Sequence, residues 1–177
     1  MKSIITAFIL IILSLQINAE EKISLAGLKP IKVRVGHGQL HAFTDGNCAE
    51  EGRPPLSCVI DGSVAQTGLY AHADSEVVYE IPKGTQRFEA FGATSANLPN
   101  VGNTRYGPRF LGTWAYEVWV DGKKLYESEP LFSYEKRSFP ITVSIPKGAK
   151  QITLKTTMLG NDNYDWSIWA EPYFVKP

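Results

Sequence analysis

The sequence predicts an all-β sandwich, and three observations support that fold class. Short runs rich in β-branched and aromatic residues recur along the chain, and several alternate apolar with polar positions. Asp-Gly pairs and Pro-Lys-Gly stretches separate these runs, as turns between strands do. After residue 19, no window of about 12 residues shows the apolar spacing of a helix.

About nine short strands are expected, and the first four lie in the N-terminal half. Residues 31–35 form the first, and residues 56–60 form the second, which ends at an Asp-Gly turn. Residues 76–81 and 87–91 flank the first Pro-Lys-Gly stretch, in which Pro fixes φ and Gly permits a positive φ.

The other five expected strands lie in the C-terminal half. Residues 113–120 form the longest run, and an Asp-Gly pair joins it to residues 124–126 as a hairpin. The second Pro-Lys-Gly stretch separates 139–145 from 151–157, and residues 168–175 close the chain. Strands at this spacing are typical of a β-sandwich.

The N-terminal segment reads as a signal peptide rather than as part of the fold. Lys2 precedes an almost wholly apolar stretch, and a small residue, Ala19, ends the segment. The apolar stretch is shorter than the ~20 residues that a membrane-spanning helix needs. We therefore expect removal of residues 1–19 and a secreted or periplasmic single domain over 20–177, with no membrane span after cleavage.

The charge balance argues against a nucleic-acid partner. The 18 basic and 18 acidic side chains give a formal net charge of zero, whereas nucleic-acid binders usually carry a basic excess. The two cysteines, Cys48 and Cys58, lie close together in a chain expected to be exported. Such a pair predicts a disulfide bond rather than a zinc site, which usually takes four ligands.

Several motifs resemble the NPCBM family, the novel putative carbohydrate-binding modules. The stretch from Gly68 to Ser75 resembles the G-L-x-x-H-A-x-S signature of that family, and Trp169 to Pro172 resembles its closing W-A-x-P. Four further motifs lie in the family's order, at residues 28–38, 88–92, 116–126 and 148–154. The resemblance therefore covers roughly residues 24–175. It implies a jelly-roll β-sandwich of the galactose-binding-like kind and a non-catalytic domain that binds carbohydrate, with galactose-type glycans as the expected ligands.

The sequence departs from the family pattern near its C-terminus. Studied members carry D-H-A-D-W, whereas here Trp166 stands in place of the His and Ile168 in place of the second Asp. One alternative is therefore a structural or protein-binding sandwich whose sugar site has been lost. Another is a glycoside hydrolase with an unrecognised carboxylate pair, for which Asp61, Asp74, Glu76 and Asp165 are the candidates.

Sugar recognition by a sandwich needs flat aromatic faces and a few polar groups for the hydroxyls. The expected carbohydrate-binding residues are Tyr70, His72, Arg105, Tyr164, Asp165 and Trp166. Trp166 suits a ligand platform and a core anchor equally, whereas Trp169 suits the core. A Ser75-His72 catalytic pair is disfavoured because near neighbours on an extended chain point apart.

No cofactor is expected. Asp162 and Asp165 are weak candidates for a structural calcium site, because their spacing does not match an EF-hand loop. The long segment 94–112, which contains Arg105, is expected to be a functional loop. We expect it to lie at one end of the sandwich with Tyr70, His72 and the turn before the last strand.

Overall fold

The computed structural model describes residues 19–46, 58–95, 112–133, 135, 137–160 and 165–177. Within these ranges the chain forms fourteen β-strands and one short 3-10 helix, η1 (Leu25–Gly27), and no α-helix. The fold is therefore an antiparallel β-sandwich, as predicted, but the estimate of about nine strands was too low. No helix in the described ranges is long and apolar enough to cross a bilayer.

The first sheet has the order β12-β8-β14-β6-β3, with β1 added along β14. All its pairings are antiparallel. Its strands are β1 (Glu21–Ser24), β3 (His41–Phe43), β6 (Gly68–His72), β8 (Arg87–Thr94), β12 (Ser138–Ser144) and β14 (Trp166–Lys176).

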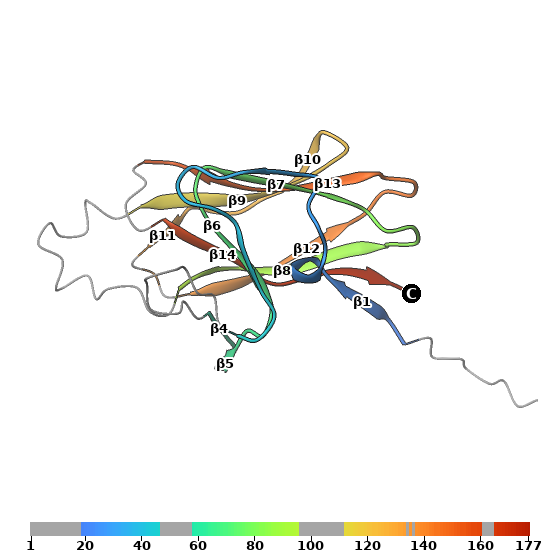
Figure 1. The fold of residues 1–177 in the computed structure, drawn as a ribbon, viewed down its shortest axis with the longest axis horizontal. Coiled ribbons are helices and arrows are strands. Elements are labelled where there is room, and N and C mark those ends of the chain that lie inside the picture. Colours follow the sequence, from blue (N-terminus) through green and yellow to red (C-terminus); the bar gives the residue numbers. More distant parts are fainter. Residues whose placement is uncertain (1–18, 47–57, 96–111, 134, 136, 161–164) are drawn as a thin grey trace, which may run out of the picture.

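The second sheet has the order β10-β9-β13-β7-β2, with β11 added along β9. Its strands are β2 (Lys32–Arg34), β7 (Ser75–Glu80), β9 (Thr113–Val120), β10 (Lys123–Glu127), β11 (Leu131–Phe132) and β13 (Gln151–Met158). Figure 1 shows the two layers, with β9 and β13 in one and β8 and β14 in the other.

The main core lies between the two sheets. The alternate positions Trp114, Tyr116, Val118 and Val120 of β9 are all buried, so this face of the strand is part of the core. Trp169 from β14 packs edge-on against the Tyr116 ring, with ring centroids 4.9 Å apart. The Tyr116 hydroxyl donates to the Ala93 carbonyl at 2.6 Å, so this buried polar group is satisfied within the core.

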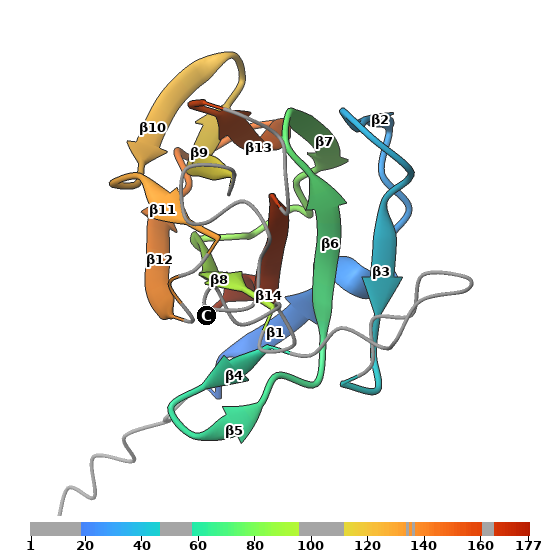
Figure 2. The same cartoon turned by 90° about the vertical axis from the view of Figure 1, so that its left-hand side faces the viewer.

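A second, smaller apolar cluster involves the first sheet and a separate two-stranded hairpin. Strands β4 (Val59–Ile60) and β5 (Ser63–Val64) form this hairpin, which Figure 2 shows apart from the two large sheets. The cluster comprises Phe43, Cys58, Ile60, Ala65, Tyr70, Ala93, Ile168 and Ala170, with Phe91 and Trp166 packed against it. Strands β6 and β14 contribute to both clusters, and all five residues of β6 and seven of the eleven residues of β14 are buried.

Candidate functional site

His72 is the centre of the candidate site, and two side chains hold its imidazole ring. The residue ends β6 and is buried. Its Nδ1 lies 2.5 Å from Oδ1 of Asp165, which immediately precedes β14 and is fully buried. Its Nε2 lies 2.9 Å from the hydroxyl of Tyr70, two residues earlier on the same strand. Tyr70, His72 and Asp165 therefore form one hydrogen-bonded group.

The chemistry of the partners fixes the proton positions in this group. An ionised carboxylate only accepts hydrogen bonds, so Nδ1 of His72 carries the proton that Asp165 accepts. In the neutral ring, Nε2 is then an acceptor, and the Tyr70 hydroxyl donates to it. The second carboxylate oxygen of Asp165, Oδ2, is buried and has no hydrogen-bond partner among the described residues. Oδ2 of Asp165 is therefore an unused hydrogen-bond acceptor. Leaving a buried carboxylate oxygen unpaired costs free energy.

Trp166 lies directly beside His72. It is the first residue of β14, although the last strand was expected to begin only at residue 168, and it pairs in register with His72 across the β6–β14 ladder. Directly opposite residues on neighbouring antiparallel strands share a face of the sheet. Trp166 is only partly buried, so the ring adjoins the hydrogen-bonded group and still faces solvent in part.

The other two histidines also gather here, which the sequence reasoning missed. The chain has three histidines in all. The exposed His37 ring packs edge-on against His72, with centroids 5.3 Å apart, and the His41 ring lies 5.7 Å from Tyr70. The presence of three histidines in the sequence could have pointed to this site. Their convergence becomes visible only when β3 is paired with β6.

The structure thus brings together four of the six predicted site residues. Tyr70, His72 and Asp165 are buried, whereas Trp166 is partly exposed. Arg105, Tyr164 and the calcium candidate Asp162 lie outside the described residues. Within the described part of the chain, no group of three or more His, Cys, Asp or Glu side chains is arranged to hold a metal ion.

The catalytic alternatives find little support in the geometry. Ser75 Oγ bonds Thr156 Oγ1 in the described structure, and both ring nitrogens of His72 are engaged by other residues. Glu76 forms ion pairs with Lys32 and Lys155. The hydrogen bond from Lys32 lowers the pKa of the Glu76 carboxyl, whereas the acid of a glycosidase needs a raised pKa.

Cys58 is buried next to β4 and forms no disulfide bond within the described residues, and its predicted partner Cys48 lies outside them. Burial raises the pKa of the Cys58 thiol to about 12, which makes this thiol inert while it stays buried. The disulfide bond stays a prediction.

A comparison with protein families places the chain. The NPCBM/NEW2 domain matches residues 22–175, which is nearly the whole sequence. The chain belongs to the NPCBM/NEW2 family. The resemblance drawn from the sequence motifs is thereby confirmed, and so is the galactose-binding-like jelly-roll β-sandwich. A comparison with curated protein sequences found no relative.

Solved structures of CBM51 carbohydrate-binding modules share the NPCBM/NEW2 fold seen here. The tandem CBM51 modules of Sp3GH98, a family 98 glycoside hydrolase from Streptococcus pneumoniae SP3-BS71, align with a TM-score of 0.72 at 20% identity. That alignment covers 90% of this chain and 48% of the other. The CBM51-2 and INT domains of Clostridium perfringens ZmpB, solved with GlcNAc, align with a TM-score of 0.70 at 19% identity, covering 88% of this chain and 32% of the other.

A third structure matches over almost its full length. CBM51 from Clostridium perfringens GH95, in complex with methyl-galactose, aligns with a TM-score of 0.66 at 19% identity, covering 87% of this chain and 99% of the other. The NPCBM/NEW2 chain therefore has the extent of one such module. It spans about a third of the ZmpB chain that was solved with GlcNAc. At these identities the likeness establishes the fold.

Proposed function

We propose that the protein is an exported, non-catalytic carbohydrate-binding module that binds galactose-type glycans beside His72. In this proposal residues 1–19 are the signal peptide and residues 20–177 are the module, which acts outside the cytoplasm. The observation that carries the proposal is the buried Tyr70–His72–Asp165 group next to the partly exposed Trp166 ring.

The group suits sugar recognition for two physical reasons. Fixed hydrogen bonds hold the polar groups in place before the ligand arrives, which lowers the entropic cost of binding. The partly exposed Trp166 ring supplies a flat apolar face for the C–H side of a pyranose. CBM51 modules of the same fold have been solved with methyl-galactose and with GlcNAc, which makes these two sugars the first ligands to test.

Loss of the sugar site is the second candidate, and one observation favours it. Ile168, which replaces the second Asp of the family's pattern, is fully buried in the cluster with Tyr70 and the β4–β5 hairpin. An apolar residue there removes one polar group from the first sheet. In that case the protein is a structural or protein-binding sandwich.

Isothermal titration calorimetry of the purified protein with methyl-galactose, GlcNAc and glucose separates the two candidates. The first proposal expects saturable binding of methyl-galactose that weakens in the Trp166→Ala variant. Binding that Trp166→Ala leaves unchanged would place the sugar elsewhere. Silence with all three sugars in a protein that melts cooperatively would favour the lost-site candidate.

A further inference from the structure

The structure contains a second candidate binding surface, far from His72. A hollow of about 1090 Å³ lies between the Pro82-Lys83-Gly84 turn and the Pro146-Lys147-Gly148 turn. Strand β7 begins at Ser75, close to His72, and ends at Glu80, which lines the hollow. Six residues of strand extend roughly 20 Å, so the hollow lies toward the opposite end of the sandwich.

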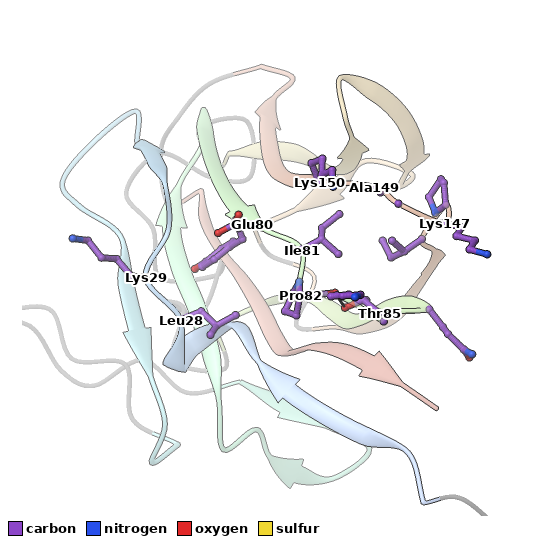
Figure 3. A pocket seen from close by; sticks show the side chains of 16 residues that line it. Leu28, Lys29, Glu80, Ile81, Pro82, Thr85, Lys147, Ala149 and Lys150 are labelled. Atoms are coloured by element: carbon purple, nitrogen blue, oxygen red, sulfur yellow. Dashed lines mark hydrogen bonds between the residues drawn. The ribbon is translucent and has the colours of Figure 1, made fainter.

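The floor of this hollow is apolar and its rim is basic. Ile81 and Ile145 form part of the floor, and Leu28 and Ala149 pack against the same core. The rim carries four exposed lysines and one glutamate, namely Lys29, Lys83, Lys147, Lys150 and Glu80. Figure 3 shows Ile81 and Pro82 in the middle, with Lys29 on one side and Lys147 on the other.

These lysines differ from most basic residues of the described structure because no carboxylate pairs with them. Lys22, Lys32, Arg87, Lys124, Arg137, Lys155 and Lys176 each form an ion pair. The described basic side chains without an ion pair are Lys29, Arg34, Lys83, Lys123, Lys147 and Lys150, and four of these six line the hollow. The rim carries a local excess of positive charge in a chain whose formal net charge is zero.

We infer that this hollow binds a segment of an anionic polysaccharide, with the lysines contacting its carboxylate or sulfate groups and the partly exposed Leu28 and Pro82 contacting its sugar rings. The charge on the rim is complementary to such a chain, and the volume slightly exceeds the range of about 300–1,000 Å³ that is usual for small-molecule pockets. This inference does not depend on the function proposed for the His72 site.

An anionic membrane is the main competing occupant, and the surface argues against it. A protein face that inserts into the boundary of a bilayer presents exposed large apolar side chains. Ile81 and Ile145 are instead each only 8% exposed, and none of the exposed large apolar side chains of the described residues lines the hollow. A concave basic surface fits a chain better than a flat lipid surface.

Binding of dextran sulfate, with neutral dextran as the uncharged control, tests this inference on the purified protein. The Lys83→Gln/Lys147→Gln variant removes two rim charges. Arg34→Gln/Arg137→Gln is the matched control, because it removes two exposed charges near the other ends of β7 and β12. Both variants are first checked for the wild-type melting temperature.

We expect dextran sulfate to bind and dextran not to bind, with affinity falling as salt rises. The rim variant should lose roughly fivefold in affinity, because two exposed ion pairs with the ligand are removed and each contributes little. The control variant should lose less than about twofold. Equal losses in both variants, or no binding of dextran sulfate, would overturn the inference. Tighter, rim-dependent binding to phosphatidylglycerol vesicles than to dextran sulfate would also overturn it and assign the surface to a membrane.

Discussion

At the scale of single residues, Trp166 and Trp169 show how one strand serves two purposes. They stand three positions apart on β14, so their side chains point to opposite faces of the sheet. Trp169 is 3% exposed and packs against Tyr116 and Phe88, whereas Trp166 lies beside His72 and is partly exposed. Their variants should therefore fail in different ways.

Trp166→Ala should weaken sugar binding and leave the fold intact. A stacked aromatic ring contributes about 0.5–1.5 kcal/mol beyond its buried area, so the loss should be several-fold to about tenfold. Trp169→Ala is the contrasting variant, and its loss of core packing should cost about 3–5 kcal/mol of unfolding free energy. Titration calorimetry and thermal melts measure the two effects. Equal unfolding of both variants would make Trp166 a core residue.

Asp165→Ala should lower stability by about 2–3 kcal/mol, because it leaves the Nδ1–H of His72 without its buried acceptor. Asp165→Asn keeps an acceptor oxygen in place and should recover part of that loss. Chemical denaturation of the three proteins gives the comparison. If Asp165→Asn is as damaging as Asp165→Ala, the hydrogen bond to His72 is not what Asp165 contributes.

At the scale of the elements, the alternation of apolar and polar residues found the strands with one solvated face. It placed β9 at its observed bounds and β7, β8, β12 and β13 within about three residues. It missed β6, because all five of its residues are buried and their sequence shows no alternation of apolar and polar positions. Strands β3, β5 and β11 are too short to show a period at all.

The candidate site, too, was predictable only in part from the sequence. His72, Asp165 and Trp166 were singled out because their chemistry suits sugars and each lies near a strand end. His37 and His41 were missed because their contacts depend on how β3 and the segment before it lie against β6, which no local pattern encodes.

Gly68 shows how closely β3 and β6 approach, and it gives an element-scale prediction. A Cβ at this position would lie 2.4 Å from the Phe43 ring and 3.0 Å from the Trp169 carbonyl oxygen. Gly68→Ala should therefore destabilise the fold by about 1–3 kcal/mol through overpacking. Adding Phe43→Leu should relieve part of that cost, as measured by a double-mutant cycle. Purely additive effects would mean that the Phe43 ring is not the obstacle.

The predicted Cys48–Cys58 bond would fasten the segment before β4. Alkylation of the native protein is a poor test, because the buried Cys58 thiol, with its pKa raised to about 12, would resist modification even when free. Alkylation in denaturant without reductant avoids this problem. Mass spectrometry should then find neither cysteine modified, and both modified after reduction. Two modified cysteines before reduction would exclude the bond.

At the scale of the whole molecule, ion pairs join strands that are distant in sequence. Hydrogen bonds from Lys32 to Glu76 and from Lys22 to Glu89 lower the pKa of each glutamate below its ordinary range. A carboxyl whose pKa is lower in the folded state stabilises the fold above its unfolded pKa of about 4.3. That contribution is lost as pH falls through the folded value.

The melting temperature should therefore fall as the solution is acidified below about pH 4.3. Replacing both carboxylates, in Glu76→Gln/Glu89→Gln, should flatten this part of the profile and lower the melting temperature at neutral pH. Calorimetric melts across this range provide the measurement. An unchanged acid profile in the double variant would assign the pH dependence to other groups.

The most direct test of carbohydrate binding beside His72 is a glycan array probed with the wild-type protein and with Trp166→Ala side by side. The proposed function predicts that the wild-type protein binds a defined set of glycans that includes terminal galactose. It predicts that Trp166→Ala, folded by its thermal melt, loses most of that signal. A silent wild-type protein, or a variant that retains the same set at the same strength, would contradict the proposal.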